Sequence, residues 1–129
     1  MGKVSRLDEL WRMIPFERFD AWRLAHRLAL DVYDASDRWP RSERYELTAQ
    51  VRRACLSVPA NVAEGVAKRG PRELRRYLDI ALGSLSELCY LLLFARDRGL
   101  ISREDWARLD EQRNRVGQLI WGIVRSLGR

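Results

Sequence analysis

The sequence is poor in the residues that most metal and acid–base sites require. It contains one histidine, His26, and two cysteines, Cys55 and Cys89. A di-iron site of the ferritin type needs two Glu-x-x-His motifs, and no carboxylate stands three residues before His26. A zinc site lacks ligands, and a Ser–His–Asp site would have to use His26, for which no partner is evident. We therefore expect no catalytic site, no metal and no cofactor.

Other absences narrow the class of protein further. The cysteines form no Cys-x-x-Cys pair and each falls in an apolar helical stretch, so we expect reduced core residues. The longest apolar run, LCYLLLFA from Leu88, is far shorter than a membrane span. The first residues contain no signal-peptide core, and no glycine-rich phosphate loop is present. We expect a cytoplasmic protein with no membrane partner.

Lysine is also scarce, and arginine carries nearly all of the positive charge. Lys3 and Lys68 are the only lysines among 24 basic residues, which exceed the 18 acidic residues and give a net charge of +6. Arginine binds phosphate and carboxylate through planar, bidentate hydrogen bonds, although genome base composition also produces an arginine bias. With 129 residues, 47% of them hydrophobic, the chain suits one folded domain.

Apolar residues recur at three- and four-residue spacing along four segments, which predicts four helices. The predicted helices cover residues 20–39, 42–68, 71–98 and 102–126. Pro40 ends the first, Pro71 is typical of a first helical position, and Ser102 is a typical N-cap. Short connections imply antiparallel neighbours. We predict an all-α, up-down-up-down four-helix bundle over 20–129, preceded by an N-terminal leader over 1–19.

The helix expected at 71–98 carries more apolar surface than one face of a bundle needs. Its apolar sector spans roughly 200° of the helical wheel, against about 100° for a surface helix. Such a helix needs cover on a second side, and in a small bundle another subunit can provide it. We therefore expect a homo-oligomer. The interface candidates are Ile80, Leu82, Leu91 and Leu93.

Polar residues form a second stripe beside the apolar one. When 42–68 folds back onto 71–98, residues at equal distances from the turn meet, which places Arg53 near Ser84. The same register places Glu87 near Gln50, and either Gln50 or Arg53 can pair with this carboxylate. The predicted structural seam comprises Gln50, Arg53, Ser57, Asn61, Glu64, Ser84 and Glu87.

The stretch LSVPANVAEG, residues 56–65, lies inside one of these helices. Pro59 removes one intrahelical hydrogen bond and should bend the helix. Ser57 and Asn61 have side chains that can satisfy backbone groups at such a bend. We interpret the stretch as a structural joint rather than a chemical site.

The chain resembles one protein family over about residues 19–127. QVRRACLSVPANVAEG (50–65) and RELRRYLDIALGSLSEL (72–88) are similar to the motifs of bacterial 23S rRNA intervening-sequence proteins, close to Q-x-R-R-A-x-x-S-x-x-x-N-x-A-E-G and E-[FL]-x-R-[FY]-L-x-I-A-x-G-S-x-x-E. Gly70-Pro71 departs from the family, which commonly has a serine cap there. The resemblance implies a four-helix protomer that forms a homopentamer. It also implies kinship with the accessory variability determinant of diversity-generating retroelements, which works with a reverse transcriptase and binds nucleic acid.

Two functions fit these observations. In the first, a non-enzymatic oligomer binds RNA or DNA as a ribonucleoprotein or reverse-transcriptase accessory. Helix stability does not explain arginines in the first turns of 71–98, because the helix dipole disfavours cations there and attracts phosphate. The candidate nucleic-acid-binding residues are Lys68, Arg69, Arg72, Arg75 and Arg76. In the second function, the protein is a protein-binding scaffold and this cluster is a solvated basic rim.

Overall fold

The computed structural model describes residues 16–128. Residues 1–15 of the predicted leader, and residue 129, lie outside the described residues. The described chain forms four α-helices and two short 3-10 turns, with no strand. The elements are η1 (Phe16–Arg18), α2 (Asp20–Ser36), η2 (Arg41–Glu43), α3 (Leu47–Ala67), α4 (Pro71–Asp97) and α5 (Arg103–Ser126). The all-α prediction is therefore confirmed for residues 16–128.

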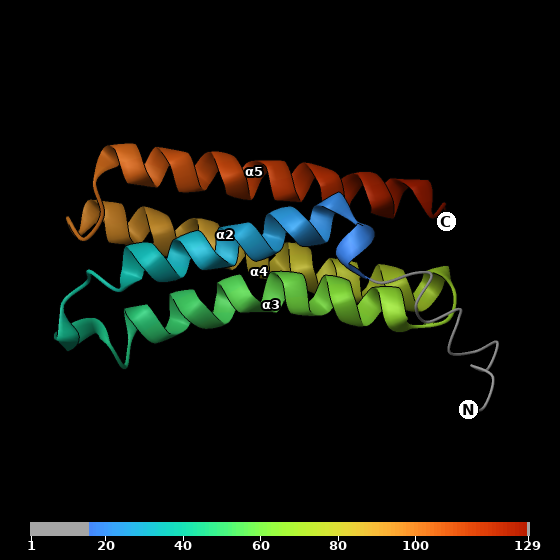
Figure 1. The fold of residues 1–129 in the computed structure, drawn as a ribbon, viewed down its shortest axis with the longest axis horizontal. Coiled ribbons are helices and arrows are strands. Elements are labelled where there is room, and N and C mark those ends of the chain that lie inside the picture. Colours follow the sequence, from blue (N-terminus) through green and yellow to red (C-terminus); the bar gives the residue numbers. More distant parts are fainter. Residues whose placement is uncertain (1–15, 129) are drawn as a thin grey trace, which may run out of the picture.

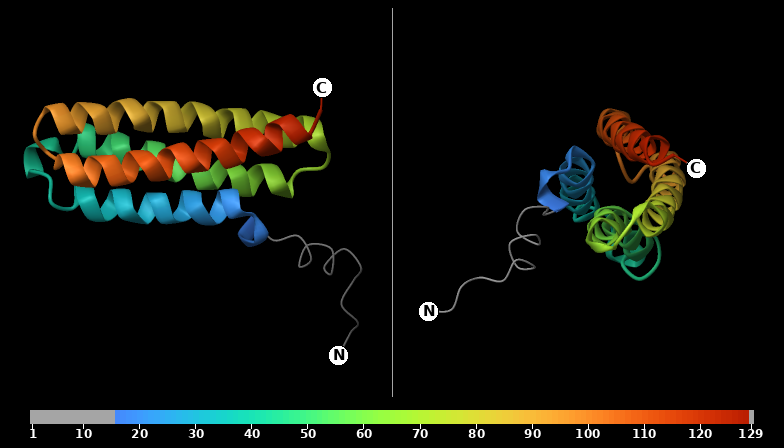
Figure 2. Two further views of the ribbon diagram at one scale, coloured as in Figure 1. Left: turned by 90° about the horizontal axis from the view of Figure 1, so that it is seen from above. Right: turned by 90° about the vertical axis from the view of Figure 1, so that its right-hand side faces the viewer.

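The four helices lie side by side, and each runs antiparallel to the one before it (Figure 1). α2 packs on α3, α3 on α4, α4 on α5 and α5 on α2, so the helices enclose one core. Figure 2 shows the same arrangement from above and from one end. The turn between α3 and α4 lies at the same end of the bundle as the C-terminus, and the connection from α2 to α3 lies at the opposite end (Figure 1).

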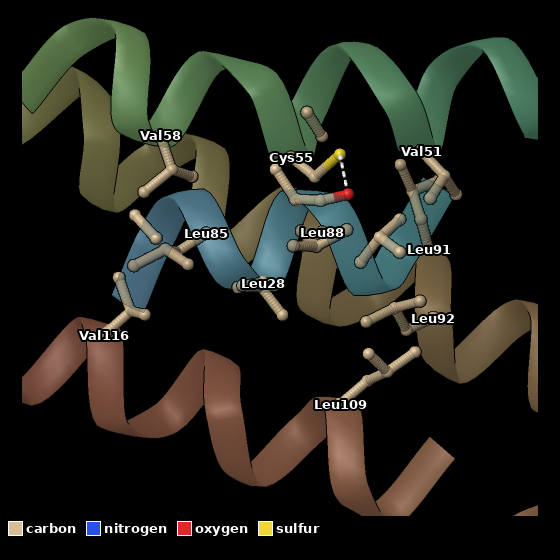
Figure 3. Close-up of a cluster of buried hydrophobic side chains, with 14 of the residues drawn as sticks. Leu28, Val51, Cys55, Val58, Leu85, Leu88, Leu91, Leu92, Leu109 and Val116 are labelled. Atoms are coloured by element: carbon tan, nitrogen blue, oxygen red, sulfur yellow. Dashed lines mark hydrogen bonds between the residues drawn. The ribbon is translucent and has the colours of Figure 1, made fainter. Parts of the chain in front are cut away.

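The core is built from aliphatic side chains that all four helices contribute, as Figure 3 shows. Leu28, Val58, Leu88 and Leu109 are each at most 1% exposed, and burying a side chain of this size contributes about 1.5–3 kcal/mol. Cys55 lies among them, with its Sγ 4.0 Å from the carbonyl oxygen of Ala29. Burial raises the pKa of the Cys55 thiol from 9.0 to about 12. Cys55 is therefore a core residue, as predicted.

α3 begins five residues later than the sequence predicts. Ser42 lies in the 3-10 turn η2, and the helix starts only at Leu47. None of the three residues of η2 is buried, and Tyr45 is 86% exposed. A short segment gains most of its helical stability from packing, so the helix forms only from Leu47, the first buried residue. α3 then continues without interruption through Pro59.

The wide apolar sector of α4 is largely covered within the protomer. Leu91 is 6% exposed and belongs to the core, while Leu82 and Leu93 are half-buried. The prediction that all four candidates face a second subunit is therefore corrected, and only Ile80 is clearly exposed, at 43%. The physical reason is that α4 has a neighbour on each side, α3 and α5, and two neighbours bury a broader sector than one.

The length and composition of α4 also meet the criteria for a helix that crosses a membrane, and no other helix in 16–128 does so. This is weak evidence, because the core helix of a soluble protein meets the same criteria. Leu78, Leu85 and Leu92 of α4 are buried against the other helices.

Candidate nucleic-acid interface at the α3–α4 turn

The turn between α3 and α4 ends in an uncapped helix start. Gly70 is the N-cap of α4 with a φ of 89°, a left-handed conformation that favours glycine, and it has no side chain to cap the helix. Pro71 follows as the first helical residue, where its missing N–H costs nothing. The first N–H groups of α4 therefore lack a side-chain acceptor, and the positive end of the helix dipole is open to an anion.

Four of the five predicted cations surround this helix start with exposed side chains. They are Lys68, Arg69, Arg72 and Arg76. The fifth, Arg75, is half-buried and donates a hydrogen bond from Nη2 to the carbonyl oxygen of Val124, at 3.3 Å. Arg75 therefore binds the last turn of α5, where a cation interacts favourably with the C-terminal carbonyls. This contact gives Arg75 a structural role that the sequence did not predict.

Tyr77 lies next to the exposed cations and was not predicted as part of the site. The Nζ of Lys68 is 5.5 Å from the centre of its ring, and the Cζ of Arg76 is 5.7 Å from it. Cations near an aromatic face are held by the ring quadrupole, and an aromatic ring can also stack on a nucleic-acid base. A tyrosine close to clustered cations was the sequence signal that could have identified it.

Carboxylates offset only part of the positive charge. Glu73 lies 3.8 Å from Arg76, measured from Oε2 to Nη1, and the side chains of Arg76 and Glu73 are 67% and 45% exposed. An exposed pair of this kind contributes little to stability, so Arg76 stays available to a phosphate. The end of α5 lies at the same end of the bundle as this turn (Figure 1). Arg125 is exposed in the last turn of α5 and adds a further cation.

A small hollow separates the start of α4 from the end of α5. Its volume is about 240 Å³, and Arg72, Arg75, Leu127 and Gly128 line it. Arg72 and the uncapped N-terminus of α4 place positive charge on one side of this hollow. The arrangement suits the backbone of a nucleic acid, which presents phosphates without demanding base-specific contacts.

The predicted polar seam forms in part. The hydroxyl oxygens of Ser57 and Ser84 are 2.7 Å apart, and the Nδ2 of Asn61 donates to the carbonyl oxygen of Ser57 at 2.8 Å and to its Oγ at 2.9 Å. The other four predicted members, Gln50, Arg53, Glu64 and Glu87, are exposed. Within the described part of the chain no ion pair or hydrogen bond joins Glu87 to Arg53 or Gln50, so that predicted pairing is wrong for the protomer.

The register of α3 against α4 explains the difference. Ser84 meets Ser57 and not Arg53, which is one helical turn away. Side chains lean toward the N-terminus of their own helix, so those of α3 lean away from the turn and those of α4 lean toward it. A residue of α3 therefore meets a residue of α4 that lies farther from the turn than equal counting predicts.

Gly65 sets the distance between the two helices beside the basic turn. A Cβ atom at Gly65 would lie 2.9 Å from the Cβ of Tyr77 and 3.1 Å from Cδ1 of Leu74. A Cβ atom essentially never approaches another atom as closely as 2.9 Å, and 3.1 Å is tighter than nine in ten Cβ contacts. The glycine at the end of LSVPANVAEG therefore allows a close helix contact that no larger residue permits.

A family model for the 23S rRNA-intervening sequence protein matches residues 17–122. The chain belongs to the 23S rRNA-intervening sequence protein family. Among solved structures, it is similar to a protein of unknown function from the S23 ribosomal protein family of Bacteroides thetaiotaomicron, with a TM-score of 0.73 and 19% identity. That match covers 81% of this chain and 97% of the other, and at this identity it supports the fold alone. Comparison with curated proteins gives no match.

Membership of this family confirms the resemblance that the sequence motifs indicated. The matched residues include the turn between α3 and α4. The matched region of the 23S rRNA-intervening sequence protein family contains all four helices up to residue 122. Within residues 16–128, no group of three His, Cys, Asp or Glu side chains is placed to hold a metal ion.

Proposed function

We propose that this member of the 23S rRNA-intervening sequence protein family is a non-enzymatic homo-oligomer that binds RNA or DNA through phosphate contacts. The observation that carries the proposal is the exposed set Lys68, Arg69, Arg72 and Arg76 around the uncapped start of α4. Cations at this end of a helix oppose its dipole, so they do not serve helix stability. A phosphate at the same place would interact favourably with both the cations and the helix.

One protomer alone would bind weakly. Four exposed cations give a salt slope of about −3 for a single strand, from about −0.7 per phosphate contact. An oligomer repeats the same cluster around its axis, and the second and later contacts then form at high effective concentration. Oligomerisation is therefore part of the proposed mechanism and not only a structural feature.

The outer face of α4 supports such an assembly. Ile80, Tyr90 and Phe94 recur on one side of the helix and are 43%, 61% and 43% exposed, with the rings of Tyr90 and Phe94 6.4 Å apart. Gly83 lies on the same face, and a Cβ added to it would meet nothing within 4 Å. Exposed aromatic and aliphatic side chains on one face are typical of subunit interfaces. The number five comes from the family resemblance.

Light scattering on Ile80→Glu plus Phe94→Glu tests the assembly. The wild type should form a closed oligomer, most simply a pentamer, and the variant should dissociate. Leu30→Glu is the matched control, because Leu30 is 45% exposed but lies on α2. A wild type that is a 15 kDa monomer at micromolar concentration would contradict the assembly.

Charge reversal tests the nucleic-acid contact. We expect Arg72→Glu plus Arg76→Glu to abolish binding of a labelled RNA while the oligomer persists. Arg38→Glu plus Arg103→Glu is the control, because both residues are exposed and neither belongs to the basic turn. Equal loss in both variants would show that net charge alone determines binding and that the turn is not the site.

A protein-binding scaffold is the second candidate, favoured by a groove beside the exposed aromatic pair. The groove has a volume of about 500 Å³, and Glu43, Glu46, Tyr90, Phe94 and Arg98 contribute to its lining. Absence of RNA and DNA binding at low salt would put this function first. The family kinship motivates the more specific proposal of a cytoplasmic reverse-transcriptase accessory, and failure of the purified protein to bind a retroelement reverse transcriptase would contradict it.

A further inference from the structure

A second small cavity lies at the opposite end of the bundle, where the connection from α2 to α3 turns back. Its volume is about 240 Å³, and Trp39, Arg41, Arg44, Thr48 and Arg52 are among the residues that line it. These residues come from the end of α2, the turn η2 and the first turns of α3. The connection from α2 to α3 and the basic turn between α3 and α4 lie at opposite ends of the bundle (Figure 1), so the cavity is separate from that turn.

Three arginines contribute to the lining of this cavity, and one of them is held rigidly. Arg52 donates from Nε to the hydroxyl of Ser36 at 3.0 Å and from Nη2 to Oδ1 of Asp37 at 2.6 Å. Arg41 and Arg44 are exposed, and neither side chain forms an ion pair with any residue in 16–128. Asp37 is the one carboxylate in the lining and already pairs with Arg52. The cavity therefore has an excess of positive charge.

Trp39 is the largest buried residue in the lining of the cavity. Its side chain is 93% buried, since 7% is exposed, and its Nε1–H has no hydrogen-bond partner. A buried donor without an acceptor typically costs about 1–3 kcal/mol. The nitrogen itself is enclosed by protein atoms, so Trp39 contributes packing to the wall of the cavity rather than a hydrogen bond to a ligand.

The start of α3 adds further donors. Thr48 is the second residue of the helix and is 7% exposed. The N-cap residue Glu46 makes no side-chain cap hydrogen bond, so the first N–H groups of α3 have no such acceptor. The positive end of the α3 dipole therefore borders the same cavity as the three arginines.

We propose that this cavity binds a phosphate group. The donors come from three guanidinium groups, a hydroxyl and a helix N-terminus, and together they exceed what the two oxygens of a carboxylate can accept. A phosphate offers three or more acceptor oxygens and the geometry that arginine pairs with. The phosphate comes either from a free phosphate compound or from the 5′ end of a nucleic-acid strand. The site is independent of the proposed contact at the α3–α4 turn.

Calorimetric titration of the full-length protein with inorganic phosphate at low salt tests the site. Arg41→Gln plus Arg44→Gln should weaken binding by at least about tenfold, since each change removes a charge-assisted hydrogen bond. Arg38→Gln plus Arg103→Gln removes the same charge from exposed residues that do not line the cavity, and should change binding less than about twofold. Absence of saturable binding by about 10 mM phosphate, or equal weakening in both variants, would overturn the proposal.

Tryptophan 39 provides a second readout. Trp39→Phe keeps an aromatic ring in the core and leaves the three arginines in place, so phosphate should still bind and the melting temperature should change little. Wild-type fluorescence should change on phosphate binding, and this change should vanish in Trp39→Phe. A fluorescence change that persists in Trp39→Phe would show that phosphate binds elsewhere and would overturn the site.

Two oligoribonucleotides of one sequence, one with a 5′ phosphate and one with a 5′ hydroxyl, distinguish the sources. Tighter binding of the phosphorylated strand, lost in Arg41→Gln plus Arg44→Gln, identifies the strand end as ligand. If the two strands bind equally and the binding of inorganic phosphate still depends on Arg41 and Arg44, the ligand is a free phosphate compound. If phosphate binding depends on neither arginine, the cavity binds neither a strand end nor a free phosphate compound, and the proposal is overturned.

Discussion

Replacement of Gly65 by alanine should destabilise the protein, although alanine is the better helix former. Gly65 lies within α3, two residues before its last residue, Ala67. At an unrestricted helix position, this change would stabilise by about 0.5–1 kcal/mol. At Gly65 the new Cβ would lie 2.9 Å from the Cβ of Tyr77 and 3.4 Å from the carbonyl oxygen of Leu74. Neither atom is the far end of a flexible side chain, so α3 and α4 must move apart.

The magnitude follows from the two opposing contributions. Overpacking in a well-packed contact costs about 1–3 kcal/mol. The gain in helix propensity is smaller, and it offsets less than half of a cost of about 3 kcal/mol. We expect a net loss of about 1–2 kcal/mol, which for a chain of this size lowers the melting temperature by roughly 4–8 °C. Because Leu74 and Tyr77 flank the basic turn, the same change should also disturb nucleic-acid binding.

Thermal unfolding followed by circular dichroism measures the effect, with Gly122→Ala as the matched control. Gly122 lies within α5, and a Cβ there would meet nothing within 4 Å. This control should raise the melting temperature by about 2–4 °C. The explanation fails if Gly65→Ala melts at or above the wild type, or if both variants shift in the same direction.

Three further predictions concern the core and the seam. In a double-mutant cycle, Ser57→Ala and Ser84→Ala should show a coupling energy of about 0.5–1.5 kcal/mol, and purely additive effects would contradict the hydrogen bond. Glu87→Ala should change the free energy of unfolding by less than about 0.5 kcal/mol, because Glu87 is exposed and unpaired in the protomer. A larger loss of stability, measured by chemical denaturation, would show that Glu87 has a partner. Burial raises the pKa of Cys55 from 9.0 to about 12, so the unfolded thiol ionises first and stability should fall between those pH values by up to about 1.4 kcal/mol per pH unit. Cys55→Ala should remove this dependence of stability on pH. An unchanged dependence would contradict the assignment of the effect to Cys55.

Most of the fold could be predicted from the sequence because helix periodicity and capping residues are local signals. Ser102 caps α5 through a hydrogen bond from the N–H of Asp105 at 3.1 Å, as its position predicts. The start of α3 could not be predicted in the same way. Ser42 also resembles an N-cap, but the residues after it bury nothing, and packing is not visible in a local pattern.

The candidate site was predictable in composition but not in detail. The cluster of cations at the α3–α4 turn follows from the sequence, whereas the bond from Arg75 to Val124 joins residues 49 positions apart. The burial of Leu91 depends on which neighbours flank α4, and a helical wheel does not contain that information.

The salt dependence of RNA binding tests the central claim most directly. Fluorescence anisotropy with a labelled single-stranded RNA across a salt series gives the slope of log affinity against log salt. If phosphates bind at the turn, the slope for the wild type should be about −3 or steeper. When Arg72 and Arg76 are both changed to glutamine, the slope should become less steep by roughly 1.4 for each protomer that contacts the RNA. No binding at about 50 mM salt, or the same slope in both proteins, would contradict the account.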